Sequence, residues 1–265
     1  MSGPRLLEGK RALIVGVGNQ RSLAWGIATA FHREGARLAF TYLGERFKEN
    51  VAKLVATLPG NEDMPLIDAD ASKPDQLAGM MGEVGTRWDG LDILVHSFAY
   101  APTDDLRRPF HEISREGVLT AVDVSAYTLV SLSNAAVPLF EKAGGGAVLA
   151  MTFNAVERVV PSYNAMAVAK AALETCVRYL AVDLGPKNIR VNTISAGPLK
   201  TLSASAVKGI SQARDLWETR SPLRRNITQD EVGNVAVFLA SEWSRSITGA
   251  TIYADNGMNI MGVAE

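Results

Sequence analysis

Short apolar runs recur along the chain, and longer segments with the period of an amphipathic helix separate them. Near-continuous apolar runs are typical of parallel strands, because helices cover both faces of a parallel sheet. We expect strands at residues 11–15, 37–42, 64–67, 91–97, 146–152, 189–195 and 251–254, with helices in most of the intervals. The alternation predicts an α/β fold, a single-domain, doubly wound, parallel seven-stranded sheet with helices on both faces. Flavodoxin-like and nucleotide-hydrolysing proteins share this pattern, so the fold alone names no chemistry.

The size and charge of the chain fit one domain over residues 1–265. Its 265 residues are 47% hydrophobic, enough to bury a sizeable core. The 27 Lys and Arg residues balance 28 Asp and Glu, so no net field attracts nucleic acid or an anionic membrane surface. Residues 1–10 are too short and too interrupted by Gly, Pro and charge to hold the apolar core of a secretion signal, and no other run approaches the length of a membrane span. We therefore expect a cytoplasmic protein with no nucleic-acid or membrane partner.

Cysteine and histidine are too sparse for an intrachain disulfide or a local metal cluster. Cys176 is the only cysteine, and His32, His96 and His111 lie far apart in the sequence. Metal sites in proteins need several such ligands close together. We expect a protein without a metal.

A glycine-rich turn follows the first expected strand and leads into a helical segment. Gly16 and Gly18 allow a tight turn and a close approach to a pyrophosphate, whose charge the helix N-terminus favours. Ser22 is placed to cap that helix and to donate to a phosphate oxygen, and Gly26 to let the helix pack closely on the sheet. The strict dinucleotide fingerprint fails, because Arg21 stands at its third glycine. A tight turn without a ligand is the alternative.

The end of the second expected strand bears on the choice of cofactor. It lacks the acidic residue that takes a ribose 2′-hydroxyl in many NAD-binding folds. Leu43 offers no charge and favours NADH, whereas Arg46 could serve the 2′-phosphate of NADPH. We expect NADH, with NADPH as the open alternative.

A tyrosine and a lysine stand seven residues apart in a segment of strong helix formers. Seven residues are almost two helical turns, so Tyr163 and Lys170 project from one face, about 10 Å apart along the axis. A nearby ammonium favours the phenolate and strengthens the phenol as a hydrogen-bond donor, which suits an oxyanion formed during hydride transfer. A Tyr and a Lys at this spacing more often lie on the exposed face of a helix without a catalytic role. Only the surrounding sequence motifs favour catalysis here.

Several motifs supply that context. Tyr163 and Lys170 have the spacing Tyr-x6-Lys, and Ala167 stands where the commoner Tyr-x-x-x-Lys motif would place its lysine. The other matching stretches are residues 16–26, 96–102, 190–198 and 254–257. With them the chain resembles the short-chain dehydrogenase/reductase superfamily, which has a Rossmann-like fold. Within it the chain is most similar to the bacterial NADH-dependent enoyl-acyl-carrier-protein reductases.

The resemblance implies a role for each residue of the site. Tyr163 would hydrogen-bond the carbonyl of an enoyl thioester on acyl-carrier protein and stabilise the enolate, and Lys170 would hold the nicotinamide ribose. Ala101 and Phe153 would contact the acyl substrate together with Tyr163. The other positions implied to bind the cofactor are Gly16, Ser22, Leu23, Leu43, Asp70, Ala71, Ser97, Phe98, Ala99, Leu199 and Thr201. A homotetramer, packed through the long helix after Tyr163, is also implied.

One position departs from the family pattern. Many relatives carry a second tyrosine ten residues before the catalytic one, where this chain has Phe153. Members that act on long acyl chains also carry Phe there, so the departure bears on chain length and inhibitor response rather than on activity. An ordinary buried aromatic is the alternative interpretation.

Residues 199–220 are rich in Ser and Ala, which suits a mobile helical lid over an acyl chain, because lids come from weakly packed segments. The side chains expected to line it are Leu202, Ala204, Ala206, Val207 and Ile210. A plain amphipathic surface helix is the alternative. Basic residues in and after this segment could dock an acidic carrier protein, although such residues more often form a solvated face.

Three functions compete at this point. The first is reduction of the trans-2 double bond of a fatty enoyl thioester in fatty acid biosynthesis. The second is a carbonyl or alcohol oxidoreductase of the same superfamily, and the third is a catalytically silent nucleotide-binding scaffold. The spacing of Tyr163 and Lys170 favours the first. Acyl chain length and the choice between carrier protein and coenzyme A depend on the shape of the pocket.

Overall fold

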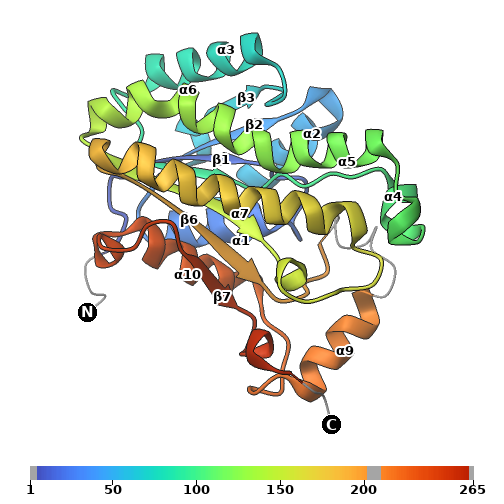
Figure 1. Ribbon diagram of the computed structural model, residues 1–265. Helices are drawn as coiled ribbons and strands as arrows, with labels where there is room; N and C mark the ends of the chain where they lie inside the picture. The colour runs from blue at the N-terminus through green and yellow to red at the C-terminus, as the bar shows by residue number, and fades with distance from the viewer. Residues whose placement is uncertain (1–4, 202–209, 263–265) are drawn as a thin grey trace.

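The computed structural model describes residues 5–201 and 210–262, and a seven-stranded parallel sheet runs through its centre (Figure 1). The strands are β1 (Arg11–Val15), β2 (Arg37–Tyr42), β3 (Leu66–Asp68), β4 (Ile93–His96), β5 (Gly146–Thr152), β6 (Ile189–Ala196) and β7 (Thr251–Ala254). Their order across the sheet is β3-β2-β1-β4-β5-β6-β7. The chain therefore winds outward from β1 to β3 and returns beside β1 with β4. Ligands of doubly wound folds bind at this reversal, beyond the carboxyl ends of the strands.

Four strands have the predicted bounds, and β6 is one residue longer than predicted. The third strand was predicted two residues too early. Pro65 has no N–H to donate to the ladder, and β3 begins just after it, at Leu66. The fourth is shorter than predicted, because Leu91 donates its N–H to Leu139 in a helix and joins no strand.

Helices cover both faces of the sheet, as predicted. One apolar core packs α1 (Leu23–Arg33), α2 (Gly44–Val55) and α10 (Gln229–Ala240) against one face. A second core packs α3 (Pro74–Arg87), α6 (Thr128–Ala143) and α7 (Asn164–Leu184) against the other. Figure 1 shows α3, α6 and α7 on one side of the sheet and α1 and α10 on the other. The strands are nearly all buried between these layers, which explains their continuous apolar sequence.

The described residues form three further α-helices. They are α4 (Thr103–Arg107), α5 (Arg115–Val122) and α9 (Ile210–Arg220). A π-helical turn, Asp123–Tyr127, joins α5 to α6. No helix in the described ranges is long and apolar enough to cross a membrane.

Gly26 of α1 has a different role from the predicted one. A Cβ atom at Gly26 would lie 2.8 Å from Cβ of Gln229, and one at Gly233 would lie 2.7 Å from Cβ of Ala30. These glycines let α1 and α10 approach each other closely. The sequence argument placed the close contact of Gly26 against the sheet, and that was wrong. Gln229 also donates its side-chain N–H to the carbonyl of Ser22, at 2.7 Å, and so ties α10 to the start of α1.

Candidate active site

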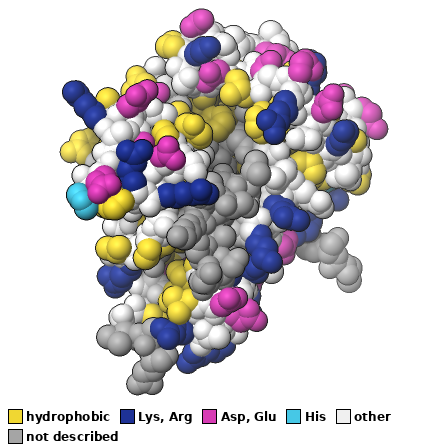
Figure 2. Space-filling view, turned by 90° about the vertical axis from the view of Figure 1, so that its right-hand side faces the viewer, with side chains coloured by type: hydrophobic (Ala, Val, Ile, Leu, Met, Phe, Trp, Pro, Cys, Tyr) yellow, Lys and Arg dark blue, Asp and Glu magenta, His cyan; other side chains and the backbone are white. Residues whose placement is uncertain are grey.

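A cavity of about 1240 Å³ opens at the carboxyl ends of the strands. Figure 2 shows hydrophobic side chains interspersed with Lys and Arg side chains on this side of the molecule. Every residue that the sequence analysis assigned to the site lines this cavity, namely Gly16, Ser22, Leu23, Leu43, Asp70, Ala71, Ser97, Phe98, Ala99, Ala101, Phe153, Tyr163, Lys170, Leu199 and Thr201. Parallel strands end at one edge of the sheet, and this brings together residues that are far apart in sequence.

The turn after β1 requires glycine at its first position. Gly16 has φ of 103°, in the region that L side chains rarely adopt. A Cβ atom there would also lie 2.5 Å from the carbonyl oxygen of Ser97, at the end of β4. Glycine at this position therefore lets the turn after β1 pass close to the backbone at the end of β4, as in the glycine turns that bind a pyrophosphate.

Ser22 caps the helix that follows this turn, as predicted. Its hydroxyl accepts a hydrogen bond from the N–H of Trp25, at 3.3 Å, and donates one to the carbonyl of Asn19, at 2.8 Å. The first turn of α1 carries no acidic residue. Its partial positive charge is thus left to favour an anion in the cavity.

The loops after β2 and β3 form one end of the cavity. Leu43 is exposed, and Gly44 after it donates its N–H to the carboxylate of Asp68 at 3.0 Å. Asp70 accepts hydrogen bonds from the N–H and hydroxyl of Ser72, so its carboxylate is engaged in the turn that presents Ala71. A flat apolar wall with a fixed polar turn suits an adenine ring.

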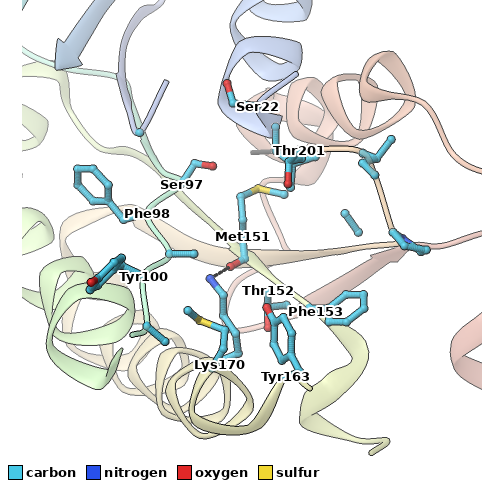
Figure 3. Close-up of a pocket in the computed structure, with 18 of the residues that line it drawn as sticks. Ser22, Ser97, Phe98, Tyr100, Met151, Thr152, Phe153, Tyr163, Lys170 and Thr201 are labelled. Atoms are coloured by element: carbon cyan, nitrogen blue, oxygen red, sulfur yellow. Dashed lines mark hydrogen bonds between the residues drawn. The ribbon is translucent and has the colours of Figure 1, made fainter. Parts of the chain in front are cut away.

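The loop after β4 is fixed by the π-helical turn. Ser125, which is fully buried, accepts a hydrogen bond from the N–H of Tyr100 at 3.1 Å. The same hydroxyl lies 3.3 Å from the carbonyl oxygen of Tyr100, to which it donates. Ser97, Phe98 and Ala99 just before it line the cavity, and Figure 3 labels the first two.

Tyr163 and Lys170 face the same part of the cavity (Figure 3). Tyr163 is the residue before the first turn of α7 rather than a residue within the helix, and Lys170 follows in the second turn. The ammonium of Lys170 is buried and donates to the carbonyl oxygen of Met151 at 2.7 Å. Met151 is near the end of β5, so sheet and helix together hold the lysine.

Burial changes the acidity of both groups. It lowers the pKa of Lys170 to about 8, because the charged ammonium is removed from water. It raises the pKa of Tyr163, whose phenol therefore stays protonated. The expectation that the ammonium would favour a phenolate is not met, because burial alone shifts the pKa of Tyr163, and it shifts it upward. A neutral phenol in this position is a hydrogen-bond donor.

Phe153 packs on Tyr163. Their ring centroids lie 5.1 Å apart with an angle of 56° between the planes, and both rings line the cavity. Tilted pairs at this distance are favourable contacts between aromatic rings. Phe153 is thus a wall of the cavity beside the phenol rather than a ring hidden in the core.

Other residues of the cavity were not anticipated from the sequence. Thr152 lies between Met151 and Phe153, and Trp217 of α9 and Met258 and Met261 near the C-terminus close the far side. Thr152 was recognisable only as the last residue of a predicted strand. The methionines follow a motif that the sequence analysis used only as a family marker, and methionine fills an irregular apolar wall well.

Only part of the predicted lid is described. Residues 202–209, including Leu202, Ala204, Ala206 and Val207, lie outside the described residues, and the side chain of Ile210 does too. The part that is described, α9, contributes Ala213, Leu216 and Trp217 to the cavity. Within the described residues no group of three His, Cys, Asp or Glu side chains could hold a metal ion.

Comparison with known proteins matches this architecture to one family. The sequence profile of the family described as enoyl-(acyl carrier protein) reductase matches residues 16–259. The chain is 43% identical over 258 residues to the enoyl-[acyl-carrier-protein] reductase [NADH] FabI of Aquifex aeolicus, covering 97% of this chain and 94% of that protein. It is 45% identical over 260 residues to the enzyme of the same name from Nostoc, covering 97% and 99% of the two chains.

Solved structures agree with the sequence matches. The Bacillus cereus enoyl-acyl carrier protein reductase with NADP+ and indole naphthyridinone superposes with a TM-score of 0.94 at 43% identity, covering 97% of this chain and 99% of that one. The Anaplasma phagocytophilum reductase in complex with NAD has a TM-score of 0.93 at 39% identity, covering 100% and 99%. Matches of this extent reach from the glycine turn to the last strand. The chain belongs to the enoyl-(acyl carrier protein) reductase family.

Proposed function

We propose that this protein is an NADH-dependent enoyl-[acyl-carrier-protein] reductase, which reduces the trans-2 double bond of fatty enoyl thioesters in fatty acid biosynthesis. The observation that carries the proposal is the pairing of Tyr163 and Lys170 in the same cavity as the Gly16 turn, in a chain of this family. Relatives named as NADH-dependent reductases support it.

The residues of the cavity fit a nicotinamide dinucleotide. Gly16, where a Cβ atom would clash with the backbone of Ser97, lines the cavity, and Ser22 and Leu23 line it at the helix end. Lys170 donates one of its three N–H groups to the carbonyl of Met151 in the described structure, and the others can donate to ribose hydroxyls. Leu43, Asp70 and Ala71 would hold the adenosine, and Leu199 and Thr201 the carboxamide and phosphates.

The chain's own side chains have distinct tasks in the reaction. When bound, NADH supplies the hydride that adds to the β-carbon of the substrate. The phenol of Tyr163 donates a hydrogen bond to the thioester carbonyl and stabilises the oxygen as it takes on enolate charge. Phe153 and Ala101 bound the acyl group. A proton from water then adds at the α-carbon, and the thioester carbonyl re-forms.

The geometry favours NADH as the cofactor over NADPH. Leu43 presents an exposed apolar side chain where a 2′-phosphate would need a cation. Arg46, on the first turn of α2, is the one candidate cation that the sequence analysis named. Solved relatives hold NAD in one case and NADP+ in another, so a parallel assay of both cofactors is part of the test.

Four further features belong to the proposal. The chain forms one domain over residues 1–265, it acts as a homotetramer in the cytoplasm, and the segment 199–220 closes over the acyl chain. Exposed apolar side chains on α7 support assembly. The contribution of α9 to the cavity wall supports the lid.

An assay with trans-2-enoyl thioesters of several chain lengths tests the function. We expect loss of reduced-nicotinamide absorbance with NADH, and a fall of at least about 100-fold in kcat for Tyr163→Phe, since removing one oxyanion donor has effects of this size. Binding of NADH to the variant should persist. Turnover of ketones but not of enoyl thioesters would support the carbonyl reductase instead, and binding without turnover of any substrate would support the scaffold.

A further inference from the structure

Glu174 is a buried carboxyl group that the proposed reaction does not use. It lies on α7, four residues and thus about one turn after Lys170, with only 8% of its surface exposed. Acidic side chains are seldom buried this far unless they are paired. Side chains four residues apart on a helix lie on one face, so Glu174 and Lys170 are neighbours.

Consecutive residues at the end of β5 hold the two side chains. The carbonyl of Met151 accepts a hydrogen bond from the Lys170 ammonium at 2.7 Å. The hydroxyl of Thr152 donates to the Glu174 carboxylate at 2.6 Å. Both Thr152 and Lys170 line the cavity (Figure 3). The strand end thus fixes a cation and an anion in the same small region.

Among the described groups around Lys170, Glu174 is the one whose charge favours the protonated ammonium. Burial lowers the pKa of Lys170 to about 8, and the negative charge of Glu174 opposes that effect. The neighbouring His96 gives no negative charge. It is fully buried, burial and the nearby ammonium lower its pKa to about 3, and it is neutral. The phenol of Tyr163 is neutral as well, since burial raises its pKa.

The groups around Glu174 shift its pKa in opposite directions. On balance the pKa of Glu174 lies above its ordinary value, mainly because burial raises it, and the charge of Glu157, which follows β5, raises it further. The hydrogen bond from Thr152 and the charges of Arg178 and Lys170 lower it. Glu157 itself is exposed and accepts a hydrogen bond from Tyr253 of β7, at 2.6 Å. Glu157 is therefore the second carboxyl of the region, outside the buried pair.

We propose that Glu174 is a positioning residue, which, held by Thr152, keeps Lys170 protonated and directed at the cofactor ribose. The inference rests on the proposed function for the identity of the cofactor. Without the carboxylate, no other anion of the described residues opposes the burial of the ammonium, and the neutral amine becomes the favoured form at moderately alkaline pH. A neutral amine loses a charge-assisted donor to the ribose hydroxyls.

NADH binding as a function of pH tests the role directly. In the wild type we expect affinity to fall as pH rises through about 8, where the pKa of Lys170 lies. Glu174→Gln keeps the size and an acceptor for Thr152 but removes the charge. In this variant the fall in affinity at high pH, the alkaline limb of the profile, should move down by about one pH unit. At the wild-type midpoint the affinity should be roughly three- to tenfold weaker, and at neutral pH it should change little. The readout is tryptophan fluorescence on titration with NADH, which needs no turnover.

Matched variants separate charge from structure. Glu157→Gln removes the exposed carboxyl of the same region and should leave the alkaline limb in place. If Glu174→Gln fails to fold, Thr152→Val and Thr152→Ser replace it. Thr152→Val, which cannot donate to Glu174, should shift the limb downward, and Thr152→Ser, which can, should restore it.

The outcomes distinguish this inference from the proposed function. An alkaline limb that is absent in the wild type, or the same in Glu174→Gln as in the wild type, overturns the positioning role. If wild type turns over enoyl thioesters while the limb is unmoved, only the positioning role fails. If wild type turns over none, the proposed function fails, and the NADH titrations still decide on Glu174.

Discussion

Two features of the structure require glycine at position 16: its backbone conformation and its close contact with Ser97. Any other residue would disturb both. The φ of Gly16, 103°, strains any L side chain, and a Cβ atom would meet the Ser97 carbonyl oxygen at 2.5 Å. Gly60 shares only the first feature, because its φ is 68° and nothing lies within 4 Å of a Cβ atom there. The pair therefore separates backbone strain from the close approach of β1 and β4.

We predict that Gly16→Ala abolishes tight NADH binding and that Gly60→Ala does not. Strain alone should lower the free energy of unfolding by roughly 1–2 kcal/mol in Gly60→Ala. Gly16→Ala should lose more, because the new methyl group must displace the end of β4, and its NADH affinity should fall at least about tenfold. Thermal unfolding and NADH titration measure the two effects. Equal stability losses with unchanged affinity would contradict the role of Gly16 in cofactor binding.

The site residues that a motif predicted all line the cavity. Tyr163 and Lys170 have a recognisable spacing, and Phe153 stands at a fixed distance from Tyr163. Thr152 and Glu174 carry no such mark. A threonine at the end of a strand and a glutamate in a helix are ordinary in sequence, and only the contact between β5 and α7 makes them a buried pair.

At the scale of elements, the start of α10 shows a capping box that the sequence analysis did not use. Thr228 accepts a hydrogen bond from the N–H of Glu231, and the Glu231 carboxylate accepts one from the N–H of Thr228. The other carboxylate oxygen pairs with Arg225 at 2.6 Å. Hydrogen bonding to Arg225 lowers the pKa of Glu231 to about 2. The box fixes α10, whose Gln229 in turn ties down the turn before α1.

We predict that Glu231→Gln destabilises the protein by about 1 kcal/mol at neutral pH, the usual value of a cap at a partly exposed site. The folded pKa lies below the unfolded one, so the stabilisation is present at neutral pH and fades as pH falls toward about 2. The difference between variant and wild type should shrink over that window. Urea unfolding across a pH series measures it. Glu62→Gln, an exposed carboxyl in a short turn, is the control for net charge. A difference that stays constant down to acid pH would contradict the role of ionisation.

The elements themselves were largely predictable, and their errors have local causes. Apolar runs between helical segments placed β1, β2, β5 and β7 with the correct bounds. The start of β3 depends on Pro65, and the contact of Gly26 depends on α10, which is some 200 residues away in sequence. Periodicity reports which face of an element is apolar and gives no information about which partner covers it.

For the whole molecule, one face of α7 remains uncovered. Tyr179 and Val182 are 72% and 75% exposed and lie three residues apart on α7, away from the sheet. Leu119 of α5 and Tyr127 of the π-helical turn are also exposed. Figure 1 shows α5, α6 and α7 running along the same side of the molecule. Apolar side chains gathered on such a face favour association with another copy of the chain.

We predict that Val182→Glu shifts the proposed tetramer toward smaller species. A charge at the centre of an apolar interface must lose water without a partner, which opposes association. Val182→Thr keeps the shape without a charge and should shift the equilibrium less. Size-exclusion chromatography with light scattering measures both. A wild type that is monomeric at all concentrations would contradict the tetramer itself.

The sequence by itself determined the fold class, the order of strands and helices, and the residues with the most recognisable chemistry. It did so because apolar periodicity, glycine turns and the spacing of Tyr163 and Lys170 are local properties of the chain. Only the tertiary structure decided which groups share the buried surroundings of Lys170, because these come from β4, β5 and α7. Burial depends on all the elements packed around a group, and burial sets its pKa. The acidity of Tyr163 and the role inferred for Glu174 therefore came from the fold.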